Sequence, residues 1–234
     1  MSQTIELTAA DGIRFPVYVS QPVGPAPVAA VIVLQEIFGV NSHIRAVADS
    51  YAAQGYLALA PDMFQRVKPG VNLGYTPGDI AAGIELKAAT EALSAPSVLQ
   101  DIQATIDHAA ALCGGKVAVL GYCWGGLLTW RAAALCTGLS AAVPYYGGGM
   151  TVGDEPHRQP KCPVLCHFGT EDHGIPMDTV EAFIQTQAEA AFPVQVATYL
   201  ANHGFNCDQR GSFNAAASAL ALQSTLAFLK LNLA

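Results

Sequence analysis

The stretch Lys116–Gly126 constrains the fold of this chain more than any other part of its sequence. It reads KVAVLGYCWGG, an apolar, β-prone run that leads into Gly-x-Cys-x-Gly around Cys123, and a helix-forming segment follows at once. This pattern is typical of a nucleophile elbow, a tight strand-to-helix turn that presents a reactive side chain, here with cysteine where serine is usual. Glycines two residues either side let the strand and the helix approach each other. The simpler interpretation is a glycine turn around a buried structural cysteine.

The helix predicted directly after Cys123 favours the catalytic interpretation. The first turn of a helix has free N–H groups and the positive end of the helix dipole, and both stabilise a thiolate or a developing oxyanion. The motif on its own is weak, but its place between a buried strand and a helix is the setting that the chemistry requires. Cys123 is therefore the candidate nucleophile.

Strand and helix patterns alternate along most of the chain. Strands are expected at 29–34, 57–60, 116–120, 140–145, 163–168 and 194–199, after an N-terminal antiparallel hairpin of residues 4–8 and 14–20. Helices are expected at 42–54, 78–94, 98–112, 125–136, 178–189 and 213–231. This alternation predicts an α/β fold with a mostly parallel central sheet and helices on both faces. The sequence has no evident linker or repeat, so residues 1–234 are expected to form one domain.

Composition and charge exclude several classes of partner. Of the 234 residues, 52% are hydrophobic and only 12% are charged, which suits buried parallel strands covered by alanine-rich helices. A net charge of −7 with scattered basic residues argues against binding to nucleic acid. The N-terminus lacks the pattern of a signal peptide and no apolar run reaches membrane-spanning length, so a cytoplasmic protein without membrane association is expected. The six cysteines are accordingly expected to be free thiols, with Cys162 and Cys166 in the core.

Two polar loops after predicted strands supply partners for Cys123. In sheets that carry a nucleophile elbow the chain order is nucleophile, acid and histidine. Asp172 follows the strand at 163–168, and His203 follows the strand at 194–199. Glu171 remains an alternative acid. The other histidines are expected to have no catalytic role: His167 within a strand, His173 on a solvated loop, and His43, His108 and His157 on helix or loop surfaces.

A glutamate directly after the first central strand is a further candidate. Glu36 follows the apolar run at 29–34, and a carboxylate in such a position is rarely buried without a partner. Its place in the chain predicts that it reaches the same sheet edge as Cys123 and can accept the thiol proton. The backbone N–H groups of Ile37 and Trp124 are then the expected oxyanion hole. A partly exposed loop carboxylate is the alternative.

Together these segments resemble the dienelactone hydrolase family, the carboxymethylenebutenolidases of the α/β-hydrolase superfamily. The matching stretches are QEIFGVNSHIRAVADSYAAQGYLALAPDMF at 35–64, GYCWGG at 121–126, FGTEDHGIP at 168–176 and NHGF at 202–205. The resemblance implies an α/β-hydrolase-type fold and a triad of Cys123, Asp172 and His203, with Glu36 activating the thiol. It also implies hydrolysis of an enol-lactone or related small ester through an acyl-cysteine, with no cofactor and no metal, by a monomer or small homo-oligomer.

The chain departs from this family where the substrate carboxylate is expected to bind. Members of the family hold it with two arginines, one of them four residues after the histidine, where this chain has Cys207. The helix expected at 78–94 offers only Lys87. Arg66 is therefore the expected substrate-binding cation, with Lys68 and Arg210 as alternatives. Neutral side chains expected to frame the pocket are Phe38, Tyr122 and Phe205.

Other functions stay open from the sequence alone. The same triad suits a general small-ester or thioester hydrolase. A non-catalytic scaffold that binds a small ligand is a different class of function. An oxidation sensor at Cys123 would prefer a second cysteine nearby, and the candidates are Cys113, Cys136 and Cys207.

Overall fold

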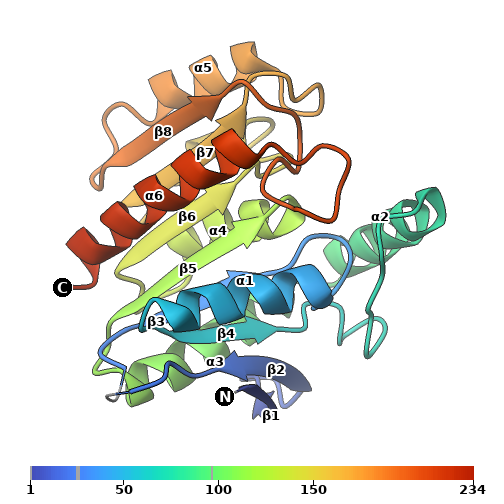
Figure 1. The fold of residues 1–234 in the computed structure, drawn as a ribbon, viewed down its shortest axis with the longest axis vertical. Helices are drawn as coiled ribbons and strands as arrows, with labels where there is room; N and C mark the ends of the chain where they lie inside the picture. Colours follow the sequence, from blue (N-terminus) through green and yellow to red (C-terminus); the bar gives the residue numbers. More distant parts are fainter. Residues whose placement is uncertain (1, 25–26, 96) are drawn as a thin grey trace.

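The computed structural model describes residues 2–24, 27–95 and 97–234. Within these residues eight strands form one sheet in the order β1-β2-β4-β3-β5-β6-β7-β8 (Figure 1). The strands are β1 (Ser2–Thr8), β2 (Arg14–Ser20), β3 (Ala30–Leu34), β4 (Leu57–Pro61), β5 (Val117–Tyr122), β6 (Ala141–Tyr145), β7 (Val164–Gly169) and β8 (Val194–Tyr199). β1 and β2 form the predicted antiparallel hairpin and β2 pairs antiparallel with β4, whereas all pairs from β4 to β8 are parallel. The predicted fold class is confirmed.

The central strands are buried along their whole length. Every residue of β3, β4, β5, β6 and β7 is buried, which explains why their sequences are continuous apolar runs rather than alternating ones. The edge strand β8 is only partly buried. The core therefore lies on both faces of the middle of the sheet. It encloses β5 and β7, the strands that lead to Cys123 and Asp172.

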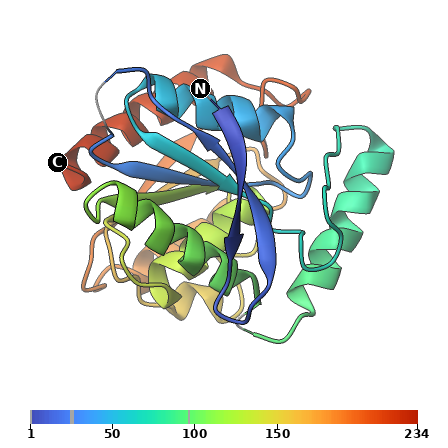
Figure 2. The same cartoon turned by 90° about the horizontal axis from the view of Figure 1, so that it is seen from below.

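Helices cover both faces of the sheet. α1 (Ser42–Ala53) and α6 (Ala215–Asn232) lie in front of it in Figure 1, and α3 (Ser97–Leu112), α4 (Trp124–Leu135) and α5 (Met177–Thr186) lie behind. α2 (Pro77–Glu91) stands to one side of the sheet in both views (Figures 1 and 2), and Gly83 and Thr90 are its only buried residues. No helix in the described part of the chain is long and apolar enough to cross a membrane.

Two helices end three residues earlier than the sequence pattern predicts. α2 ends at Glu91 rather than at residue 94, before the Ser94-Ala95-Pro96 segment that disfavours helix. α5 ends at Thr186 rather than at residue 189, because Gln187 turns its buried side chain to the carbonyl oxygens of Pro156 and Arg158. Pro156 lies within a short 3₁₀ helix, η1 (Glu155–His157), that the sequence did not predict, and Arg158 follows it directly.

Candidate active site

Cys123 occupies a strained turn between β5 and α4. Its φ of 56° lies in the left-handed region, which a non-glycine residue adopts only when its surroundings impose it. A Cβ on Gly121 would overlap the Gly125 carbonyl, and a Cβ on Gly125 would overlap the carbonyls of Leu34 and Gln35. The two glycines therefore let β5, α4 and the end of β3 meet at the turn, as the elbow pattern predicts. Cys123 itself is half-buried.

His203 links Cys123 to a buried carboxylate. Its Nδ1 donates to Asp172 Oδ2 at 2.6 Å, and the Asp172 side chain is only 1% exposed. The other oxygen of Asp172 accepts a hydrogen bond from the Gly174 backbone N–H at 2.9 Å. The rival acid Glu171 and His173 are exposed on the same loop.

The groups around His203 favour its protonated, cationic form. Burial alone would lower the pKa of His203. The negative charge of a Cys123 thiolate and hydrogen bonds with Asp172 and Cys123 outweigh burial and raise this pKa to about 10. A Cys123 thiolate and the Asp172 carboxylate thus stabilise the imidazolium that forms when His203 takes up a proton.

The backbone around the predicted oxyanion hole is fixed by close packing. Trp124 is the first residue of α4, so its N–H has no acceptor within the helix. Ile37 follows β3 at the same sheet edge, and Gly83 of α2 lies against the Ile37 carbonyl so closely that a Cβ there would overlap it. The two N–H groups remain the predicted oxyanion donors.

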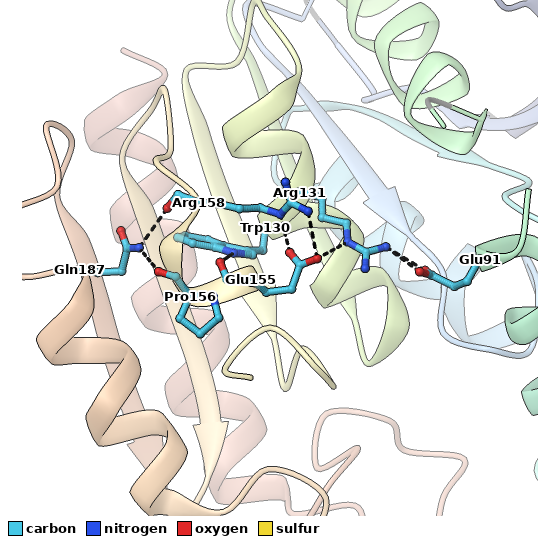
Figure 3. Close-up of polar contacts among 7 residues, drawn as sticks. All are labelled: Glu91, Trp130, Arg131, Glu155, Pro156, Arg158 and Gln187. Carbon is cyan, nitrogen blue, oxygen red and sulfur yellow. Dashed lines mark hydrogen bonds and ion pairs between the residues drawn. The ribbon is translucent and has the colours of Figure 1, made fainter. Parts of the chain in front are cut away.

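The buried Trp124 side chain contacts a network of charged groups. The indole stacks on Phe64 and its Nε1 donates to Glu91 at the end of α2, at 2.7 Å. Glu91 also accepts two hydrogen bonds from Arg131 of α4. Arg131 donates a further hydrogen bond through its Nε to the Glu155 carboxylate (Figure 3). The network joins the residue after the nucleophile to both α2 and α4.

Glu36 is buried in the site, but its contacts differ from those predicted. The side chain is 1% exposed; Oε1 accepts from Arg210 Nη1 at 2.9 Å, and Oε2 accepts from the Tyr75 hydroxyl at 3.2 Å. Both carboxylate oxygens therefore have partners other than the Cys123 thiol. Tyr75, which lies in an irregular segment before α2, could not be assigned to the site from sequence.

Arg210 is the cation that the sequence could not place. Its guanidinium lies 5.8 Å from the ring centroid of Phe38 and 5.9 Å from that of Tyr75, and the side chain is 20% exposed. Gly204, next to His203, has a φ of 78° and no Cβ, and the space is filled by the Arg210 guanidinium. Burial opposes the charge, but Glu36 and Cys123 raise the pKa of Arg210. This arginine reaches the site from seven positions after the histidine instead of four.

The expected role of Arg66 needs correction. Its guanidinium donates to Asp11 at 2.5 Å and to the fully buried Asp101 at 2.7 Å, tying the N-terminal hairpin to α3. A buried carboxylate needs a cation as its partner, and Arg66 is that partner for Asp101. Arg66 is therefore not available to bind substrate beside Cys123. The side chains of Phe38, Tyr122 and Phe205 are exposed by 2% or less. They pack beneath the site, so the structure does not place them at a surface open to substrate.

Two further residues surround Glu36. His43, expected on a helix surface, is buried, and Cys207 is fully buried. Ligand atoms of Glu36, His43 and Cys207 lie within 4.8 Å of one another. Burial lowers the pKa of His43, whereas burial and the Glu36 charge raise the pKa of Cys207 to about 11. Both are therefore neutral near pH 7. His167, in contrast, is a satisfied core residue, hydrogen-bonded to Tyr199 and Thr225 as the sequence suggested.

Comparisons with known proteins point to one family over almost the whole chain. The sequence profile of the dienelactone hydrolase family matches residues 15–233. A carboxymethylenebutenolidase-like protein of Synechocystis sp. is 38% identical over 223 residues, which cover 88% of this chain and 87% of that protein. Carboxymethylenebutenolidase of a Pseudomonas species is 32% identical over 239 residues, covering 98% and 95% respectively.

Solved structures show the same fold over almost the whole chain. A dienelactone hydrolase homologue from Klebsiella pneumoniae has a TM-score of 0.83 at 30% identity, covering 98% of this chain and 99% of that one. A dienelactone hydrolase-like promiscuous phosphotriesterase from metagenomic libraries, 23% identical with a TM-score of 0.78, covers 99% of this chain and 98% of its own, and shows the fold alone. The chain belongs to the dienelactone hydrolase family, a family of carboxylic ester hydrolases with the α/β-hydrolase fold.

Proposed function

We propose that this protein hydrolyses an enol-lactone or small carboxylic ester through an acyl intermediate on Cys123. The observation that carries the proposal is the line from the Cys123 turn through His203 to the buried Asp172, with the 2.6 Å hydrogen bond that orients the imidazole. A nucleophile, a base and an orienting acid in this order are what covalent catalysis on an ester requires.

In the proposed reaction His203 carries the proton. With Nδ1 bound to Asp172, Nε2 takes the proton of the Cys123 thiol, and the thiolate attacks the ester carbonyl carbon. The N–H groups of Ile37 and Trp124 stabilise the resulting oxyanion. The C–O bond of the lactone breaks, and the imidazolium returns its proton to the leaving enolate oxygen. His203 then activates a water that hydrolyses the thioester and restores the thiol.

Glu36 and Arg210 would control the first step of this reaction, in which the Cys123 thiol loses its proton. A substrate that carries a free carboxylate can bind Arg210 in place of Glu36, since guanidinium binds both carboxylates in the same way. The released Glu36 carboxylate is then free to turn towards Cys123, accept the thiol proton and pass it on to His203 Nε2. The position of Arg210 supports this role, because its cation lies within electrostatic reach of both Glu36 and Cys123.

The test is turnover together with a search for the covalent intermediate. Purified protein is assayed with enol-lactones, p-nitrophenyl esters and a thioester, and acid-quenched reactions are examined by intact and peptide mass spectrometry. We expect an acyl adduct on Cys123 and a loss of about 10⁴-fold or more in kcat for Cys123→Ala with the fold retained.

The matched control is Cys136→Ala, which removes a buried cysteine at the far end of α4. It should retain both turnover and the adduct. Activity that survives in Cys123→Ala, or an adduct on another residue, would show that the nucleophile is misassigned.

A further inference from the structure

The group around Glu36 has the composition of a metal site. Glu36, His43 and Cys207 supply a carboxylate, an imidazole and a thiol, all buried, with ligand atoms within 4.8 Å of one another. Zn²⁺ takes this mixture of oxygen, nitrogen and sulfur ligands in tetrahedral sites, with bonds of about 2.0–2.3 Å. Such bonds place ligand atoms roughly 3.3–3.8 Å apart, so the three need to approach by only about 1 Å.

His43 independently indicates that this group can bind a ligand. It is 3% exposed, yet its Nε2 is fully buried and has no hydrogen-bond partner among the described residues. Its other ring nitrogen, Nδ1, lies 3.5 Å from Asp208 Oδ1. An imidazole that donates Nδ1–H to a carboxylate presents a lone pair on Nε2, and this carboxylate–histidine arrangement is the usual support of a metal-bound histidine. A buried polar atom without a partner destabilises the protein, and a ligand bound at Nε2 would remove that cost.

We propose that Glu36, His43 and Cys207 bind a thiophilic divalent cation, Zn²⁺ being the representative ion, and that binding inhibits the enzyme. Binding forms bonds from the metal to Cys207 Sγ, His43 Nε2 and one Glu36 oxygen, and the Cys207 thiol loses its proton to solvent. The Arg210 guanidinium leaves Glu36 and turns towards solvent, where it is already partly exposed. A fourth position is open to water.

Inhibition follows from the shared ligand and rests on the function proposed for Glu36. A carboxylate held by a metal cannot accept the thiol proton, and a displaced Arg210 no longer lies over Phe38 and Tyr75 to receive a substrate carboxylate. The binding itself does not depend on that function, so it can be measured separately from turnover.

The experiment titrates the full-length protein with Co²⁺ and Zn²⁺. Tetrahedral Co²⁺ bound to thiolate gives visible d–d bands and a near-ultraviolet sulfur-to-cobalt charge-transfer band, and Zn²⁺ should displace it at one equivalent. We expect the charge-transfer band in wild type and in Cys123→Ser, and its loss in Cys207→Ser. Asp208→Asn, at an exposed residue, should bind 10- to 100-fold more weakly because the supporting carboxylate is gone.

Controls separate this site from the other thiols. Cys136→Ser, a matched buried cysteine, should bind like wild type, and circular dichroism confirms the fold of each variant. Zn²⁺ should inhibit wild type, whereas Cys207→Ser should resist it relative to its own zinc-free rate. Absence of binding in wild type overturns the proposal. So does a band that persists in Cys207→Ser but is lost in Cys123→Ser, which would place the metal on Cys123 and His203.

Discussion

Two buried carboxylates lie in the site around Cys123. The difference between their hydrogen-bond partners distinguishes a carboxylate that is fixed in place from one that can exchange partners. Asp172 and Glu36 are each 1% exposed, and each pairs with a partly exposed cationic side chain, His203 at 2.6 Å and Arg210 at 2.9 Å. The second oxygen of Asp172 is held by the backbone N–H of Gly174, two residues away on the same loop. The second oxygen of Glu36 is held by a side chain, the Tyr75 hydroxyl, from a distant segment.

The Asp172 pair is therefore built to keep one geometry, whereas the Glu36 pair can exchange partners. A backbone N–H on a short loop moves only with that loop. Arg210 and Tyr75 lie in loops after β8 and before α2, and the guanidinium has open solvent on one side. We therefore propose that Asp172 orients the base and that Glu36 responds to a ligand.

Asp172→Asn tests the fixed pair and should have the largest effect. Asparagine keeps the shape but favours the wrong imidazole tautomer, so kcat should fall about 10⁴-fold without loss of fold. Steady-state kinetics and a thermal melt measure the two outcomes. Glu171→Gln, at the exposed neighbour, should leave kcat unchanged. If instead Glu171→Gln is damaging and Asp172→Asn is silent, the orienting acid is wrongly assigned.

Glu36→Gln tests the exchangeable pair. Glutamine retains a hydrogen-bond acceptor for Arg210 but cannot take the thiol proton, and general acid–base steps contribute about 10²–10⁴-fold. We expect kcat to fall by roughly 10²–10³-fold with a much smaller change in KM. A rise in KM with kcat unchanged would make Glu36 a binding residue and remove the difference in role drawn above.

The residues of one pair, Asp172 and His203, are predicted from the sequence, whereas the partners of Glu36 in the other pair are not. Cys123, Asp172 and His203 each follow a strand of the parallel part of the sheet, and parallel strands bring such residues to one edge. Arg210 and Tyr75 lie in long irregular segments whose path depends on tertiary packing, such as the space left by Gly204. His43 was misread because α1 packs this polar residue inward against Tyr122. The sequence predicts that Arg66 is available to bind substrate, because it does not reveal that Asp101 is buried and needs Arg66 as its partner.

Arg210→Met tests which ligand the exchangeable pair recognises. Hydrogen bonds to charged groups contribute about 1.5–3 kcal/mol, which corresponds to about 10- to 150-fold at ~1.4 kcal/mol per decade. We expect wild type to prefer a free-acid dienelactone over its methyl ester by that factor in kcat/KM, and Arg210→Met to lose the preference. Arg66→Met is the matched control and should retain it, since Arg66 serves Asp11 and Asp101. Loss of the preference in the control alone would locate the carboxylate site elsewhere.

The pH dependence of stability gives the smallest effect and distinguishes the two pairs once more. The pKa of His203 is raised to about 10 in the folded protein, against about 6.5 when unfolded. The stabilisation from this shift is complete below pH 6.5 and is lost as the pH rises through 10, because the folded state then gives up its extra proton. The Tm difference between wild type and His203→Gln should therefore shrink between pH 6 and pH 10, by roughly 2–4 °C per kcal/mol. Arg210 keeps its charge throughout this window, so the Tm difference between wild type and Arg210→Met should not follow the same curve. Parallel curves for the two variants would mean that His203 does not hold its proton more tightly in the folded protein, and that the anionic groups around it do not stabilise its cation.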